Sequence, residues 1–161
     1  MIPTLTKQHA PQLIPILSEL PSHALPVYMG KVSAGRTTGF ASPAQDYEKD
    51  GLDILKKLVT NPPATFICYV GKDDDSMVDA GIYPGAIIIV DRSIDFKSGL
   101  NVLVVVDGEF MVKRLYRKRK EDDYELHSKN SIKNYPPIRY REGIQIEFEG
   151  VVTSAVTIFR K

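Results

Sequence analysis

The sequence lacks the features that define several common classes of protein. Its single cysteine, Cys68, lies in an apolar run over 66–70. One thiol cannot form an intramolecular disulfide or a cysteine-based metal site, so we expect a buried core thiol in a reducing compartment. The 21 Lys and Arg residues nearly balance the 20 Asp and Glu residues, which leaves a net charge of +1. That balance gives no general attraction to nucleic acid.

Long apolar runs are also missing. No stretch reaches the roughly 18 apolar residues that a membrane-spanning helix needs. The first residues lack the basic start and long apolar core of a secretory signal peptide. With 43% hydrophobic residues the chain can nevertheless bury a core. We therefore expect a cytoplasmic protein without a membrane partner.

Several catalytic and metal-binding patterns are absent as well. The three histidines, His9, His23 and His127, belong to no Gly-x-Ser-x-Gly or metal-binding motif. The acidic run 73–75 lacks the spacing of a calcium-binding loop, and no glycine-rich phosphate loop occurs. We expect neither a Ser/His/Asp triad nor a metal or other cofactor.

Residues 1–50 differ in composition from the rest. Five prolines fall within the first 26 residues, and glycines at 30, 35 and 39 continue the pattern. This composition predicts a flexible arm that is too short and too rich in proline for a helix-turn-helix head. We expect the arm to precede a β-rich domain over 51–161. That domain begins with a helix near 50–60, capped by Asp50 and ended by Pro62.

Strand patterns dominate the domain after residue 64. Short apolar runs bounded by turn residues predict strands, and Asp107-Gly108 predicts a tight hairpin turn. The expected strands are 66–70, 86–90, 101–106, 109–116, 122–127, 144–149 and 151–159. Many short strands with regular turns predict a mainly β, partly barrel-like fold.

Lys113 is a candidate general base because of its strand neighbours. Side chains alternate along a strand, so Met111, Lys113 and Leu115 share one face. Burial between apolar neighbours would lower the pKa of the lysine, and a neutral amine can accept a proton from a serine hydroxyl. Periodicity alone still favours the alternative, an exposed lysine on an edge strand.

Ser76 is a candidate nucleophile because it lies in a loop before a strand, where nucleophiles and oxyanion-binding amides are often found. Taken by itself, Ser76 is better interpreted as a helix cap. The basic cluster 117–120 is followed by three acidic residues. We interpret it as a solvated hairpin tip and expect no sequence-specific DNA binding.

In combination these segments resemble the UmuD family, a relative of the LexA and phage-repressor self-cleaving peptidases. Residues 33–35 resemble the scissile region, 39–47 the segment after the cut, 75–82 the nucleophile motif and 107–115 the strand of the general base. Ser76 and Lys113 are 37 positions apart, as in the family. The family usually has glycine where this chain has Asp74.

The resemblance implies a LexA/signal-peptidase-like fold of coiled β-sheets and a catalytic Ser76/Lys113 dyad. The backbone amides of Ser76 and Met77 would bind the oxyanion. The bond cleaved would be Ala34-Gly35, whose small residues suit a tight site, and the alternative is Thr38-Gly39.

The resemblance also implies partners. It predicts a homodimer whose self-cleavage is stimulated by a RecA filament on single-stranded DNA in the SOS response. The shortened chain would then serve a UmuC-like, error-prone Y-family DNA polymerase in translesion synthesis. Two alternatives are a self-cleaving LexA-like repressor fragment, which the missing DNA-binding head disfavours, and a non-catalytic polymerase-binding module.

Overall fold

The computed structural model describes residues 24–25, 52–117, 123–139 and 144–159. These fall into two compact units, with residues before Asn61 in one unit and those from Asn61 onward in the other. Within the described residues, no helix has the length and apolar character required to cross a membrane.

The smaller unit pairs two short strands and one helix. Strand β1 (Ala24–Leu25) pairs antiparallel with β2 (Leu52–Asp53), and helix α1 (Ile54–Leu58) follows directly. The side chain of Asp53 accepts a hydrogen bond from the Lys56 N–H at 3.2 Å, which caps the helix. The predicted helix over 50–60 was therefore too long, because Leu52–Asp53 form a strand and the helix covers only Ile54–Leu58. Asp53, not Asp50, is its cap, and Asp50 lies outside the described residues.

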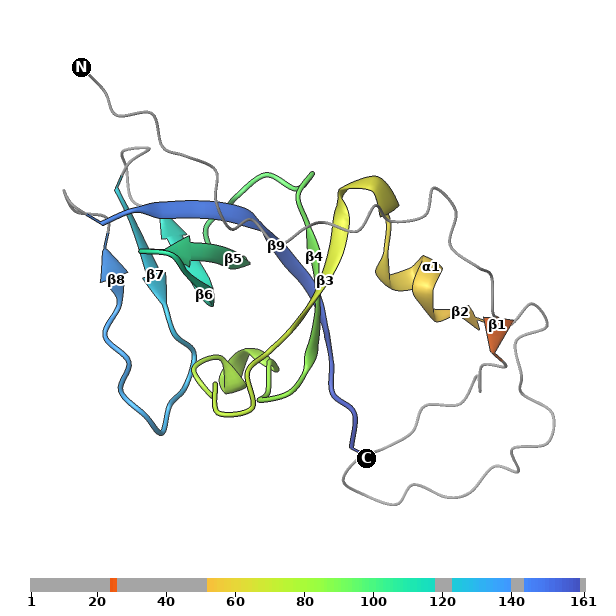
Figure 1. The fold of residues 1–161 in the computed structure, drawn as a ribbon, viewed down its shortest axis with the longest axis horizontal. Helices are drawn as coiled ribbons and strands as arrows, with labels where there is room; N and C mark the ends of the chain where they lie inside the picture. Colours follow the sequence, from red (N-terminus) through yellow and green to blue (C-terminus); the bar gives the residue numbers. More distant parts are fainter. Residues whose placement is uncertain (1–23, 26–51, 118–122, 140–143, 160–161) are drawn as a thin grey trace, which may run out of the picture. The chain divides into compact units, whose positions relative to one another are not determined.

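The larger unit is a seven-stranded antiparallel sheet with the strand order β3-β4-β9-β5-β6-β7-β8 (Figure 1). Its strands are β3 (Thr65–Tyr69), β4 (Ile87–Asp91), β5 (Asn101–Val106), β6 (Glu109–Arg117), β7 (Tyr124–His127), β8 (Ile138–Arg139) and β9 (Ile146–Val156). Two further turns, Pro62–Ala64 and Val78–Ala80, are 3-10 helical. The predicted mainly β fold is confirmed.

The β5–β6 hairpin follows the predicted pattern closely. Val106 pairs with Glu109 across a two-residue turn. Asp107 and Gly108 both have positive φ, 48° and 88°, as a tight hairpin turn of this type requires. The hairpin fixes the register of β6, which places Lys113 opposite Val102.

Strand β9 departs from the prediction, because one long strand replaces the two expected on either side of Gly150. It pairs with β4 along one edge and with β5 along the other, with a register shift in each pairing (Figure 1). A Cβ atom at Gly150 would lie 2.6 Å from Val90 Cγ1 and 3.0 Å from the Asp91 carbonyl oxygen. The glycine therefore marks a close approach of two strands, not a turn.

Two apolar clusters form the core of this unit. One is built on Val102, Val104, Val106, Leu115, Leu126 and Val151. The other contains Met77, Ile82, Ile88, Val90 and Leu103, with Val112 packed against it. Side chains alternate between the two faces along β5 and β6, so both strands contribute to both clusters. The residues next to Lys113 in the sheet are therefore packed against the core.

Candidate active site

The site lies where β6 meets the loop that follows β3. Lys113 extends from the middle of β6, and Ser76 lies just before the Val78–Ala80 turn. Lys113 Nζ is 3.0 Å from Ser76 Oγ, within hydrogen-bonding distance. Two residues 37 positions apart in the chain are therefore in direct contact.

The hydroxyl of Ser76 does not cap a helix. The N-cap residue of the Val78–Ala80 turn is Met77, and no side chain makes a capping hydrogen bond there. Ser76 is only 5% exposed, and it packs beside buried Met77. This geometry replaces the interpretation of Ser76 as a helix cap.

Burial changes the protonation of Lys113. The side chain is partly buried, and loss of solvent disfavours its charged form, so its pKa is lowered from the ordinary lysine value. The negative charge of Asp74 opposes this effect. The Tyr135 ring lies 5.9 Å from Nζ. The interpretation of Lys113 as a fully exposed edge-strand lysine is therefore wrong.

A second segment, residues 128–135, clamps the loop that carries Ser76. The Lys129 N–H donates to the Ser76 carbonyl at 2.7 Å, and Lys129 in turn accepts from the Asp79 N–H at 2.9 Å. Asn130 Nδ2 donates to the Asp75 carbonyl at 2.9 Å. These bonds fix the backbone on both sides of the serine.

The side chain of Asp75 adds a further tie between the two segments. It accepts a hydrogen bond from the Tyr135 hydroxyl and pairs with the Lys133 ammonium. Both contacts hold the pKa of Asp75 below its usual value, with Lys133 the larger cause. Asp75 is therefore an anion whose side chain links the Ser76 loop to the 128–135 segment.

The predicted oxyanion amides are only partly open. The Ser76 N–H donates to Asp74 Oδ1 at 3.2 Å, so one of the two predicted donors already has a carboxylate partner. Met77 follows directly in the chain and packs in the core below.

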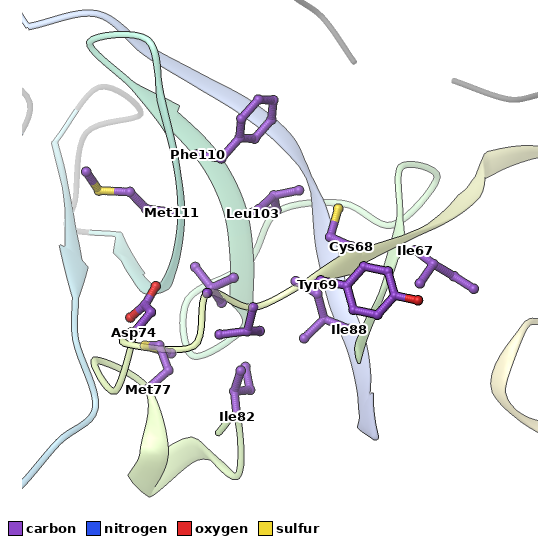
Figure 2. Close-up of a pocket in the computed structure, with 13 residues that line it drawn as sticks. Ile67, Cys68, Tyr69, Asp74, Met77, Ile82, Ile88, Leu103, Phe110 and Met111 are labelled. Atoms are coloured by element: carbon purple, nitrogen blue, oxygen red, sulfur yellow. The ribbon is translucent and has the colours of Figure 1, made fainter. Parts of the chain in front are cut away.

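An apolar pocket of about 400 Å³ opens beside the pair (Figure 2). It lies between the end of β3, the Ser76 loop and the β5–β6 hairpin. Its walls are formed by Ile67, Cys68, Tyr69, Val70, Gly71, Asp74, Met77, Ile82, Ile88, Leu103, Phe110, Met111 and Val112. Figure 2 shows Asp74 and Met77 together at one end of it. Concave, mostly apolar pockets of this kind are typical ligand-binding sites.

Other residues singled out from the sequence have varied positions. Cys68 was expected to be a buried core thiol. It packs against the core but is only partly buried, and it lines the pocket, where burial raises the pKa of its thiol. Ala34, Gly35, Thr38 and Gly39 lie outside the described residues, as does most of the basic cluster. Sequence patterns did not identify Asn130 or Tyr135, whose roles depend on contacts across the fold.

Comparison with known proteins identifies the family. Residues 26–153 match the Peptidase S24-like family, so the chain belongs to it. Membership places the chain among serine peptidases at the level of the family. The mostly antiparallel β structure with little helix agrees with the fold of that family.

Individual relatives show which members of this family the chain resembles. MucA of Salmonella typhimurium is 40% identical over 93 residues, which cover 58% of this chain and 60% of MucA. ImpA of Salmonella typhimurium is 36% identical over 94 residues, 58% of this chain and 61% of ImpA. The LexA repressor of Xylella fastidiosa is 32% identical over 127 residues, 79% of this chain and 54% of that protein.

MucA and ImpA are UmuD-family proteins, so the resemblance to that family is confirmed. The matched region spans about three fifths of their length.

Proposed function

We propose that the chain is a serine peptidase that cleaves its own N-terminal arm with Ser76 as nucleophile and Lys113 as general base. The observation that carries this proposal is the 3.0 Å contact between Lys113 Nζ and Ser76 Oγ. It is supported by the lowered pKa of the lysine and by the apolar pocket alongside. The substrate arm, residues 1–50, precedes the peptidase domain, residues 51–161.

The first step forms an acyl-enzyme. Neutral Lys113 accepts the proton of the Ser76 hydroxyl while Oγ attacks the scissile carbonyl carbon. The carbonyl oxygen becomes an oxyanion, and the Ser76 and Met77 amides donate to it. The tetrahedral intermediate collapses, the peptide C–N bond breaks, and the Lys113 ammonium donates its proton to the leaving amine.

The second step releases the arm. A water molecule loses a proton to Lys113 and attacks the ester carbonyl. The ester bond to Oγ breaks, and Lys113 returns the proton to the serine oxygen. The products are an arm fragment with a new carboxylate and a peptidase domain with a new amino terminus, and the dyad is restored.

The arm must reach this site in extended form. The pocket between β3 and the β5–β6 hairpin would accept its apolar side chains next to the scissile bond. We assign the cut to Ala34-Gly35, because Ala is small and unbranched. The alternative, Thr38-Gly39, has a β-branched residue on the acyl side, which hinders close approach to Ser76.

We further propose the biological role that the UmuD family implies. The protein is a cytoplasmic homodimer, and a RecA filament on single-stranded DNA promotes its cleavage. The shortened form then acts as accessory subunit of a UmuC-like Y-family polymerase in SOS translesion synthesis. The similarity to the UmuD-family proteins MucA and ImpA supports this role.

The test is intact-mass measurement before and after incubation with RecA, single-stranded DNA and a nucleotide, and separately at alkaline pH. N-terminal sequencing of the product should give Gly35 as the first residue, and Gly39 would instead assign the cut to the alternative bond. A chain that stays intact under both conditions would contradict the peptidase proposal and favour a non-catalytic binding module.

A further inference from the structure

Asp74 touches the proposed dyad in a way that the mechanism above does not use. Its Oδ1 accepts a hydrogen bond from the backbone N–H of Ser76 at 3.2 Å. In the proposed function that same N–H stabilises the oxyanion. One N–H directs its hydrogen to one good acceptor at a time. The Asp74 carboxylate and the reacting carbonyl oxygen therefore compete for this donor.

Asp74 also acts on the general base. Burial lowers the pKa of Lys113, whereas the negative charge of Asp74 raises it. Ser76, the Tyr135 ring, and Val102 opposite it on β5 also lie near Lys113. The charges of Asp75 and Lys133 pair with each other. Asp74 is thus the carboxylate whose field favours the protonated, inactive ammonium.

Asp74 lines the pocket beside the dyad, at the same end as Met77 (Figure 2). Its side chain is solvent-exposed and held by a single i,i+2 hydrogen bond. The net free energy of such a solvent-exposed hydrogen bond is small, because water competes for both groups, so an entering peptide can displace it. The carboxylate is consequently a removable obstruction and not a fixed part of the core.

We propose that Asp74 is a positioning residue that restrains self-cleavage. In the resting site its carboxylate covers the Ser76 amide and places a negative charge near Lys113, and the arm must displace it before the oxyanion can form. This inference rests on the proposed function. It identifies a residue that sets the rate of the reaction without taking part in the bond changes.

Two substitutions separate the two effects. Asp74→Asn removes the charge but keeps an oxygen that can accept from the Ser76 N–H. Asp74→Ala removes both. Asp73→Asn is the matched control, because it removes the same formal charge from the adjacent, exposed position. Circular dichroism and thermal melting of each variant establish that the fold is retained.

Self-cleavage rates are measured from pH 6 to 10. Asp74→Asn should cleave about three- to tenfold faster near pH 7, with the advantage disappearing at high pH, where Lys113 is neutral in either chain. Asp74→Ala should remain about three- to tenfold faster even at high pH, because the amide is free throughout. Asp73→Asn should follow the wild-type profile.

A second readout does not depend on cleavage. In a Ser76→Ala background, NMR titration of the Lys113 side chain should give a lower midpoint with Asp74→Asn than with Asp74 retained. If no chain cleaves at any pH, the proposed function fails, and this titration still decides whether Asp74 charges the lysine. An unchanged midpoint, or an Asp74→Ala chain that cleaves no faster than wild type at any pH, overturns the inference.

Discussion

Replacing Lys113 by arginine separates proton transfer from charge and hydrogen bonding. In the wild-type protein the lysine nitrogen is 3.0 Å from Ser76 Oγ, and an arginine there can still donate to that oxygen. Its guanidinium stays protonated, however, and cannot accept the hydroxyl proton. A positioned general base contributes about 10²- to 10⁴-fold to a rate. We therefore expect Lys113→Arg to slow self-cleavage at least about 100-fold.

The dependence of the wild-type cleavage rate on pH also tests whether Lys113 is the base, and burial of Lys113 determines the direction of that dependence. Below the folded-state pKa of Lys113, each pH unit raises the neutral fraction about tenfold, so the rate should rise by the same factor. Because desolvation lowers that pKa, the rate should level off below the roughly 10.4 of a free lysine. Lys113→Arg should lose this dependence.

The assay follows the intact fraction by mass spectrometry between pH 6 and 10, with circular dichroism as the check of folding. Lys129→Arg is the matched control. Lys129 contacts the Ser76 loop through its backbone, while its ammonium lies 5.1 Å from the Tyr116 ring, a position that arginine can keep. Wild-type cleavage by Lys113→Arg, or a flat wild-type profile, would refute lysine as the base.

Three further predictions concern the nucleophile, the sheet and the assembly. Ser76→Ala should remain folded and uncleaved, and cleavage at the wild-type rate would eliminate the mechanism. Gly150→Ala should lower the free energy of unfolding by about 1–3 kcal/mol, because its methyl group would crowd Val90 and the Asp91 carbonyl. Gly71→Ala, which meets no such crowding, is the control in urea denaturation. Light scattering should detect a homodimer before and after cleavage, and a monomer at micromolar concentration would contradict it.

The local part of the fold was predictable from the sequence. Short apolar runs and an Asp-Gly turn specified the β5–β6 hairpin almost residue by residue. Strand β9 was wrongly predicted as two strands, because a glycine such as Gly150 commonly marks a turn. Here a glycine is needed because β4, from a distant part of the chain, approaches the backbone closely. Strand β8, only two residues long, has too little periodicity to be detected.

Local sequence patterns were not sufficient to predict the Ser76/Lys113 pair. Periodicity placed Lys113 between two apolar neighbours, but contact with Ser76 depends on how β6 and the Ser76 loop pack together. Motif resemblance supplied that pairing. The clamp made by Asn130 and Tyr135 left no signal, because a polar loop with an Asn and a Tyr has the same composition whether or not it binds another loop.

Burial and the Asp74 charge act on Lys113 in opposite directions, and their balance depends on water. In the open site Asp74 is exposed, so solvent screens its field, and its bond to the Ser76 amide is weak. An arm that enters the pocket excludes water, which increases the desolvation of Lys113. If it also displaces the carboxylate, the amide becomes available at the same moment. Docking of the substrate would then activate both members of the site without any movement of β6, so the reaction rate would be controlled by delivery of the arm.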